Sequence, residues 1–297
     1  MPCYHPIPAR TNHKWKAGQI VQARPTLYPD TDANLQLPCG KCLGCLTDRA
    51  QDWAHRAMHE ASQHEHNIFV TLTYNEESLP RDEQLEPEEL QRFLKRLRRA
   101  TARKRKTETA IRSTPPHRLR YIAAGEYGER GGRPHYHLLL FNITFTDFHE
   151  VGTGLYESPT LSRIWPYGHN RCGVVTEASA AYTAQYTLKK QSEIFVTPDG
   201  VVKTKPFMRM SLKPLIGSQW LEKYRNDLQH GYLVTTQGKT RIPRTYRTKL
   251  ATLEPELHNK IRQSLDNYRE AAPHDQDLEA AERIHKRRKE LTENRKL

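Results

Sequence analysis

The hydrophobic and polar positions of the chain fall into short patterns that predict a mixed α+β fold. Apolar residues at helical spacing predict a helix over about 46–63. The β-branched and aromatic run at 67–74 predicts a strand, because it ends at a cluster of turn-forming residues. Pro87 fits the first turn of a second helix. The apolar stripe of that helix consists of Leu90, Phe93, Leu94 and Leu97.

The middle of the chain reads as further strands and a third helix. Residues 118–127 and 135–142 predict two strands joined by a loop, and residues 143–170 read as an insertion. A short strand is expected at 173–175. Thr176 then fits the N-cap of a helix, because its hydroxyl can accept a hydrogen bond from a free backbone N–H.

The order of these elements is helix, strand, helix, strand, strand, strand, helix. It favours an antiparallel sheet with helices on one side. The domain organisation that follows is a Cys-rich element at 1–50, a main domain at 51–245 and a charged tail at 246–297 that is helical or disordered.

Composition narrows the class of partner. The chain has 297 residues and a net charge of +13, which favours an anionic partner, nucleic acid before membrane. No apolar run reaches the roughly 18 residues of a membrane span. The first residues lack the apolar stretch of a signal peptide, so we expect a cytoplasmic protein whose five cysteines stay reduced.

A His-x-His pattern on the predicted strand at 135–142 indicates a metal site. His135 and His137 share a face because side chains alternate along a strand. If the preceding hairpin turns between residues 130 and 131, Glu126 lies opposite His135 on the same face. Glu129, in the loop, is the alternative carboxylate. This ligand set suits Mg²⁺ or Mn²⁺, and the nitrogen ligands tilt it toward Mn²⁺.

The segment AAYTAQYTLKK supplies candidate nucleophiles. Tyr182 and Tyr186 are four residues apart and therefore share a face of the predicted helix. Lys189 and Lys190 follow them, and nearby cations lower the pKa of a phenol. Paired tyrosines on a helix usually only pack, but the metal site gives these two a reaction centre to face.

Cys39, Cys42 and Cys45 form a CxxCxxC pattern, and Cys3 lies upstream. Four thiolates most often select a structural zinc ion. Free thiols and an iron–sulfur cluster are the alternatives, and His5 is a substitute for Cys3. Cys172, beside a predicted strand, is expected only to pack.

Taken together, FVTLTY, GEYGERGGRPHYHLLLF and YTAQYTLKK resemble, in that order, the three motifs of the HUH endonucleases. The chain is especially similar to the rolling-circle replication initiators of microviruses of the gokushovirus type. PCGKCLGC and the segment at 211–224 add to that resemblance, which covers residues 3–247.

The resemblance implies a ferredoxin- or RRM-like core with flanking helices. It implies a divalent metal held by His135, His137 and Glu126, and a tyrosine that attacks the origin phosphodiester, leaving a 5′-phosphotyrosine link and a 3′ hydroxyl for the host polymerase. Two-tyrosine members are thought to alternate their nucleophiles, here Tyr182 and Tyr186. A host helicase is a further expected partner.

Contacts to single-stranded origin DNA are expected from threonines, arginines and one aromatic ring near the metal site, because aromatic rings stack on bases and cations follow the backbone. The candidates are Thr71, Thr73, Tyr74, Arg130 and Arg133, with Trp165, Tyr167 and His169 as weaker ones.

Two other functions remain open from the sequence. A plasmid or transposon nickase would use the same residues. A non-catalytic RRM-like binding protein would explain the charge and the fold, but it gives no reason for the histidines, Glu126 and the paired tyrosines together.

Overall fold

The computed structural model describes residues 3–12, 19–22, 35–102, 110–116, 118–128, 132–152, 154–189, 195–196, 200, 202–270 and 277–294. Of residues 10–12, 19–22, 35, 185–189, 195–196, 268–270 and 292–294 only the course of the backbone is described. The chain divides into two compact units, Met1–Arg49 with Tyr268–Leu297, and Ala50–Asn267.

The larger unit is built on a seven-stranded antiparallel sheet with the order β14-β6-β7-β4-β11-β10-β9. The strands are β4 (Asn67–Thr73), β6 (Arg120–Tyr127), β7 (Pro134–Phe141), β9 (His149–Gly152), β10 (Leu155–Glu157), β11 (Asn170–Gly173) and β14 (Phe207–Met210). The predicted α+β class with an antiparallel sheet and flanking helices is confirmed.

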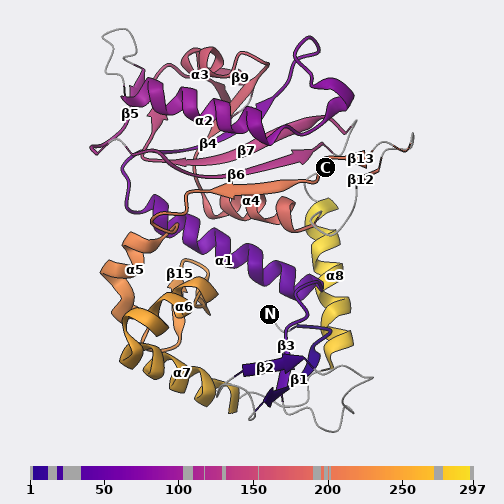
Figure 1. Ribbon diagram of the computed structural model, residues 1–297, viewed down its shortest axis with the longest axis vertical. Coiled ribbons are helices and arrows are strands. Elements are labelled where there is room, and N and C mark those ends of the chain that lie inside the picture. Colours follow the sequence, from indigo (N-terminus) through magenta and orange to yellow (C-terminus); the bar gives the residue numbers. More distant parts are fainter. Residues whose placement is uncertain are drawn as a thin grey trace. The chain divides into compact units, whose positions relative to one another are not determined.

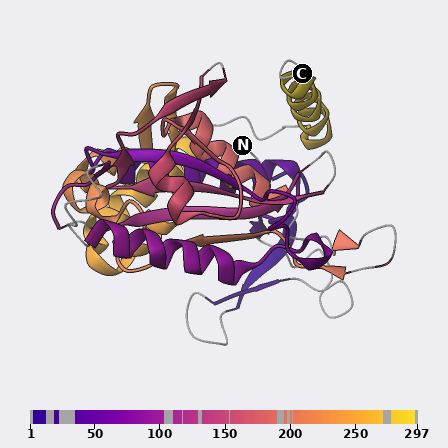
Figure 2. The ribbon, with the colours of Figure 1, turned by 90° about the horizontal axis from the view of Figure 1, so that it is seen from above.

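The helices cover both faces of the sheet, so the prediction of helices on one side is wrong. One face packs on α2 (Pro87–Ala102), which runs in the direction of the strands (Figure 1; Figure 2). The other face packs on α1 (Leu43–Ala61) and α4 (Glu177–Lys189). Alternation explains the difference: Leu138 and Leu140 face α2, whereas Leu139 and Phe141 face α1 and α4.

Residues 143–170, expected as an insertion, belong to the core in part: Ile143, Phe145 and Leu161 are buried in it, whereas β9 is exposed along its length. The segment forms β8 (Thr144–Phe145), which pairs with β5 (Ile111–Arg112), then β9, β10 and α3 (Pro159–Ile164). Trp165, at the end of α3, is completely buried and donates its indole N–H to the carbonyl of Thr73 at 3.0 Å. The strand expected at 173–175 lies earlier, at 170–173, and Val174 is exposed.

The remaining helices of this unit form a separate apolar cluster. They are α5 (Ser218–Tyr224), α6 (Arg244–Leu253) and α7 (Pro255–Glu270), joined by the hairpin β15 (Tyr232–Thr235) and β16 (Gly238–Arg241). The larger unit also contains the short elements η2 (Arg81–Glu83), β12 (Phe195–Val196), β13 (Val202–Lys203) and η3 (Arg225–Leu228). Tyr246, Leu250, Leu257 and Ile261 are buried in the cluster, so this stretch, assigned to the charged tail by its composition, packs into a core.

The smaller unit contains β1 (Ile7–Asn12), β2 (Gln19–Gln22), β3 (Leu35–Leu37), the start of α1 and α8 (Leu278–Asn294). The N-terminal element bonds to α8: the Tyr4 hydroxyl lies 2.9 Å from Nδ1 of His285, and His5 pairs with Glu282 at 3.0 Å. No helix in the described part of the chain has the length and apolar character needed to cross a membrane.

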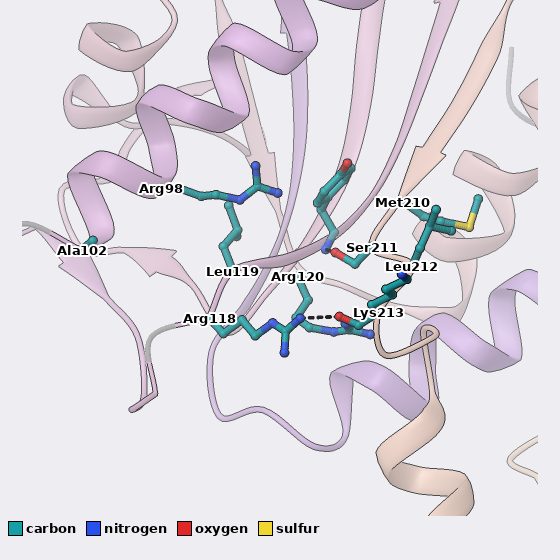
Figure 3. Close-up of a pocket in the computed structure, with 10 residues that line it drawn as sticks. Arg98, Ala102, Arg118, Leu119, Arg120, Met210, Ser211, Leu212 and Lys213 are labelled. Carbon is teal, nitrogen blue, oxygen red and sulfur yellow. Dashed lines mark hydrogen bonds between the residues drawn. The ribbon is translucent and has the colours of Figure 1, made fainter.

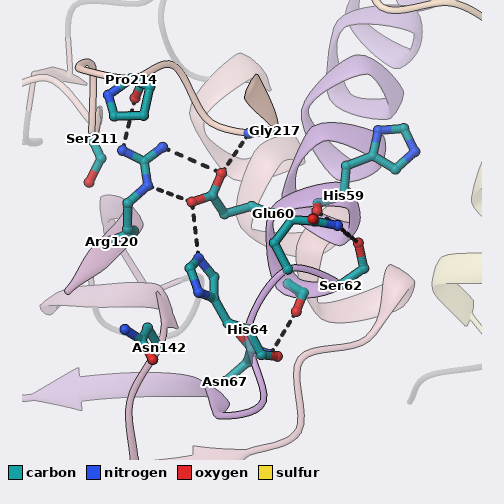
Figure 4. Close-up of polar contacts among 12 residues, drawn as sticks. His59, Glu60, Ser62, His64, Asn67, Arg120, Asn142, Ser211, Pro214 and Gly217 are labelled. Carbon is teal, nitrogen blue, oxygen red and sulfur yellow. Dashed lines mark hydrogen bonds and ion pairs between the residues drawn. The ribbon is translucent and has the colours of Figure 1, made fainter. Parts of the chain in front are cut away.

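A buried ion pair ties α1 to the sheet. Glu60 and Arg120 bind each other through both carboxylate oxygens, and the Glu60 carboxylate also accepts the N–H of Gly217 at 2.7 Å (Figure 4). Gly217 has φ 79°, and a Cβ there would lie 2.1 Å from the hydroxyl oxygen of Tyr246. Burial alone would raise the pKa of Glu60, but hydrogen bonds from His64, Arg120 and Gly217 lower it to about 2.

This pKa predicts an acid-sensitive contribution to stability. Because the folded pKa lies below the unfolded value of about 4.5, ionised Glu60 stabilises the fold above that pH, and the contribution is lost as the pH falls toward 2. We expect about 2 kcal/mol of the free energy of unfolding to disappear through this group between pH 5 and pH 3. Urea unfolding of wild type and Glu60→Gln at both pH values measures it.

In Glu60→Gln this pH-dependent component should be absent. Glu65→Gln is the matched control, because the Glu65 side chain is 72% exposed and should leave the wild-type pH dependence intact. An equal loss of stability in wild type and Glu60→Gln would contradict the assignment.

Candidate metal centre and tyrosine helix

The candidate metal ligands lie on adjacent strands in the register that the sequence predicted. Glu126 of β6 pairs with His135 of β7, and His137 pairs across the sheet with Thr71 of β4. Their side chains occupy the α4 face of the sheet, opposite the face on which Tyr136 and Leu138 are buried against α2. Hairpin pairing and strand alternation therefore bring together three residues that are up to 11 positions apart.

One oxygen of Glu126 faces both histidines. Nε2 of His135 and Nε2 of His137 each lie 2.8 Å from Oε1 of Glu126. Glu126 is 1% exposed and His137 is 5% exposed. Burial would raise the pKa of Glu126, but hydrogen bonds to the two histidines lower it, while burial lowers the pKa of His137. The site therefore favours an ionised carboxylate beside a neutral imidazole.

Other groups fix the direction of the two imidazole rings. Nδ1 of His137 lies 2.9 Å from the hydroxyl of Thr71, and Nδ1 of His135 lies 3.2 Å from the carbonyl of Arg133. The ring of Phe69 stacks on His137 with centroids 5.8 Å apart. These contacts occupy the outer nitrogens and leave both Nε2 atoms directed at Glu126, as second-shell partners of metal-binding histidines do.

The residues fit a divalent cation. One ligand atom from each of Glu126, His135 and His137 lies within 4.8 Å of the others. Among the residues that the structure describes, none gives the buried second oxygen of Glu126 a hydrogen bond, and such an oxygen is costly unless a cation or a donor meets it. Three protein ligands leave coordination positions for substrate oxygens.

Tyr182 lies beside this cluster. Its ring is half-buried and contacts His137 edge-to-face, with centroids 5.1 Å apart. α4 carries it there: Thr176 caps the helix by accepting the N–H of Ser179 at 3.1 Å, and Ala180 is buried against the sheet. The predicted cap is confirmed, and the small alanine allows the helix to approach closely.

Several predicted residues lie outside the described part of the site. The side chains of Tyr186 and Lys189 belong to the stretch described only by its backbone, and Glu129, Arg130 and Lys190 lie outside the described residues altogether.

The described DNA candidates have different environments. Thr71 holds His137, a role that sequence reasoning missed, although strand alternation places Phe69, Thr71 and the histidines on one face. Thr73 is half-buried and bonds to the carbonyl of His169. Arg133 pairs with Glu76 and donates to the carbonyl of Tyr74 at 3.1 Å.

Tyr74 is a core residue. It is 5% exposed, and its hydroxyl lies 3.0 Å from that of Tyr136. Its ring packs edge-on against Trp165, which is also buried. Burial raises the pKa of Tyr74, so its hydroxyl stays protonated. Neither Tyr74 nor Trp165 offers a free ring face to a base, whereas Tyr167 is half-buried and His169 is largely exposed.

The four predicted cysteines form a second cluster, in the smaller unit. Their sulfur atoms lie within 4.8 Å of one another. The Cys3–Cys42 and Cys39–Cys45 sulfurs are 3.8 and 4.0 Å apart, close to the roughly 3.8 Å edge of a zinc tetrahedron with Zn–S bonds of about 2.3 Å. His5 instead pairs with Glu282, so Cys3 supplies the fourth group.

Backbone N–H groups surround these sulfurs. Cys42 and Cys45 donate to the sulfurs of Cys39 and Cys42 at 3.3 and 3.5 Å. Burial would raise the pKa of the Cys42 thiol, but hydrogen bonds, led by the N–H of Cys45, lower it to about 6. Cys172, by contrast, packs in the core of the larger unit, and burial raises its pKa to about 12.

Comparison with known proteins connects this arrangement to a family. Residues 67–191, which include β4, the β6–β7 hairpin and α4, match the family described as replication-associated protein ORF2/G2P. The chain is 34% identical over 263 residues to replication-associated protein VP4 of Bdellovibrio phage phiMH2K, covering 86% of this chain and 79% of that protein.

A second relative is replication-associated protein ORF2 of Spiroplasma virus 4, 34% identical over 209 residues that cover 64% of this chain and 61% of that protein. A third is ORF4 of Chlamydia phage 1, 30% identical over 52% of this chain and 38% of that protein. No solved structure matches the chain. The alignment with the phiMH2K protein extends over most of both sequences, and the resemblance that the motifs predicted is confirmed: the chain belongs to the microvirus-type family of phage replication-associated proteins.

Proposed function

We propose that the protein is a metal-dependent, HUH-type nickase and strand transferase that starts rolling-circle replication on single-stranded origin DNA inside an infected host cell. The observation that carries this proposal is the contact of Tyr182 with His137, with ring centroids 5.1 Å apart, at a cluster of two histidines and a buried carboxylate. A nucleophile of this kind and a cation site in contact are the two parts that the reaction needs.

Glu126, His135 and His137 would hold the divalent ion, Mg²⁺ or Mn²⁺. When bound, that ion would polarise a phosphodiester oxygen and offset the charge that develops on it. Thr71 and the Arg133 carbonyl keep the histidine rings in place. The Glu126 carboxylate, which is 1% exposed, would supply the negative charge that holds the cation.

The reaction of the tyrosine is a transesterification. The phenol oxygen of Tyr182 loses its proton and forms a bond to phosphorus, while the bond from phosphorus to the 3′ oxygen breaks and that oxygen takes up a proton. One phosphodiester replaces another, so the energy of the bond is retained in the 5′-phosphotyrosine link. A 3′ hydroxyl can attack that link in reverse and rejoin the strand without ATP.

Tyr186 would be the second nucleophile, one helical turn after Tyr182. Lys189 lies three residues after Tyr186, whereas Gln185 occupies the same position relative to Tyr182. If that lysine offsets developing charge, the two tyrosines are unequal. The free 3′ hydroxyl would serve the host polymerase, and a host helicase would open the template.

A non-catalytic nucleic-acid-binding protein is the alternative from a different class. It would use the charge and the sheet, but it has no need of a buried carboxylate shared by two histidines beside a tyrosine. A plasmid or transposon nickase would use the same centre, but the relatives come from phages, which favours the phage version.

The four-cysteine cluster would hold a structural Zn²⁺. Its sulfur separations fit a tetrahedral thiolate site, and the bonded N–H groups favour thiolates over thiols. Because the four cysteines join the N-terminal segment to the start of α1, the ion would stabilise the N-terminal fold rather than take part in chemistry.

The nicking reaction is tested with 5′- and 3′-labelled single-stranded origin DNA and Mn²⁺. A covalent adduct should form on the 5′ side of the cut and vanish with EDTA. Tyr182→Phe with Tyr186→Phe should lower adduct formation by roughly 1,000-fold or more, because no nucleophile remains. Tyr156→Phe, an exposed tyrosine on β10, is the matched control and should react as wild type does. If the folded protein binds this DNA but never cuts it, the nickase proposal is wrong and the non-catalytic DNA-binding function is supported.

A second test concerns the position of His137. Thr71→Val removes the hydroxyl partner of Nδ1 at nearly constant volume, so the imidazole loses its orientation. We expect about 10- to 100-fold weaker Mn²⁺ binding by calorimetry, the usual effect of losing an outer-shell partner, while Thr71→Ser keeps wild-type affinity. Equal Mn²⁺ affinity in Thr71→Val and wild type would show that the hydroxyl does not position the ligand.

Metal analysis of the purified protein tests the cysteine cluster. We expect about one tightly held zinc per chain, lost in Cys42→Ser and retained in Cys172→Ala, whose sulfur lies in the core of the other unit. Iron in place of zinc would identify the cluster as an iron–sulfur site. Finding neither zinc nor iron in undamaged protein would show that the four-cysteine cluster does not hold a metal ion.

A further inference from the structure

A basic groove lies in the larger unit between α2 and the sheet edge formed by β6 and β14. Two adjoining cavities of about 520 and 260 Å³ make it, and Arg98 and Tyr121 line both. Arg98 extends from α2, and Arg118 reaches the carbonyl of Lys213 on the facing loop (Figure 3). We call this the basic groove.

The basic groove has one sign of charge. Of the described residues that line it, none is an aspartate or a glutamate and six are cations: Lys95, Arg98, Arg118, Arg120, Arg209 and Lys213. Glu60 neutralises Arg120. Within the described part of the chain, no carboxylate pairs with Arg98, Arg118 or Lys213, so their charges face the groove uncompensated.

The wall of the basic groove is held rigidly. Ser211 and Tyr121 exchange two hydrogen bonds, from the N–H of Tyr121 to the serine hydroxyl at 3.1 Å and from the N–H of Ser211 to the Tyr121 carbonyl at 3.0 Å. Arg120 donates to the carbonyl of Pro214 at 2.9 Å, next to its ion pair with Glu60. The loop that carries Lys213 is therefore placed before any ligand arrives, which lowers the entropic cost of binding.

Apolar surface accompanies the cations. Leu212 is 64% exposed at the groove, and the guanidinium of Arg98 lies over the ring of Tyr121, 5.6 Å from its centroid. A free phosphate or other small anion would use the cations but not this apolar surface. Single-stranded nucleic acid uses both, because its phosphates follow cations while its bases contact apolar or aromatic groups.

We propose that the basic groove binds the backbone of a single-stranded DNA segment outside the reaction centre. Tyr121 and Glu126 lie on the same strand about 17 Å apart, and their side chains point to opposite faces of the sheet. A strand in the groove therefore cannot be the nucleotides at Glu126; it is DNA flanking them. The choice of DNA as the nucleic acid rests on the proposed function.

The experiment compares two triple variants that lose the same charge. The groove variant, Arg98→Gln with Arg118→Gln and Lys213→Gln, removes three exposed cations of the basic groove. The control variant, Lys223→Gln with Arg244→Gln and Lys260→Gln, removes three exposed cations on α5, α6 and α7. Affinity for a 30-nucleotide oligo-dT is measured by fluorescence anisotropy over a range of salt concentrations. No catalytic residue is altered, so the assay does not depend on cleavage.

The groove variant should bind roughly 10- to 100-fold more weakly at 0.1 M salt, and its slope of log K against log salt should fall by about 2, the value for three lost phosphate contacts on a single strand. The control variant should change much less. Equal affinities and slopes in the two variants would overturn the proposal, and so would a groove-dependent preference for duplex DNA of the same length.

A cross-linking measurement keeps the proposal testable if the groove variant loses its fold. p-Benzoylphenylalanine at Leu212 should cross-link to the oligo-dT, whereas the same group at Val234, which is 76% exposed on β15, should not. Equal cross-linking at both positions would count against the groove. If the protein fails to cut DNA yet cross-links at position 212, the proposed nickase function is wrong, but the proposal of a DNA-binding groove is supported.

Discussion

The strand register of β6 and β4 on β7 is the constraint on which the candidate reaction centre depends. It sets Glu126 opposite His135 and Thr71 opposite His137. Since side chains alternate along a strand, a slip of one residue would move Glu126 to the α2 face and separate it from both histidines. The apolar alternation of β6 resists that slip, because the slip would also move Ala123 and Tyr127 away from the core on the α2 face. The alternation of side chains along these strands therefore determines both the packing of the core and the position of the candidate metal ligands.

The two faces of the sheet differ in the size of the side chains that pack against them. On the α2 face, large side chains such as Phe93 and Trp165 fill the space between helix and strands. On the α4 face, Ala180 and Ala184 are buried, so the helix backbone comes close and the Tyr182 ring reaches His137. Small residues at this contact thus decide the distance between the candidate nucleophile and the candidate metal ligands.

The centre was predictable because its determinants are local. His135, His137 and Glu126 belong to one hairpin, so alternation and a turn position were enough to place them. The strands β9, β10 and β14 are not predicted, because they are only three or four residues long and carry polar residues such as Arg209; β14 is a strand only through its pairing with β6, more than 80 residues earlier. The sequence predicts Tyr74 as a DNA contact because the residue that buries it, Trp165, lies about 90 residues later in the chain.

The two ends of β6 lie beside groups of opposite charge. At its C-terminal end, a buried carboxylate is shared by two histidines and receives no hydrogen bond from a described residue on its second oxygen, an arrangement that a cation would complete. At its N-terminal end, Glu60 takes up the charge of Arg120, so the buried cation is paired while Arg98 and Arg118 remain available at the surface. Because one rigid strand separates the ends, loss of charge at the groove and loss of a ligand at Glu126 should act on different quantities, strand affinity and bond cleavage, with little energetic coupling between them.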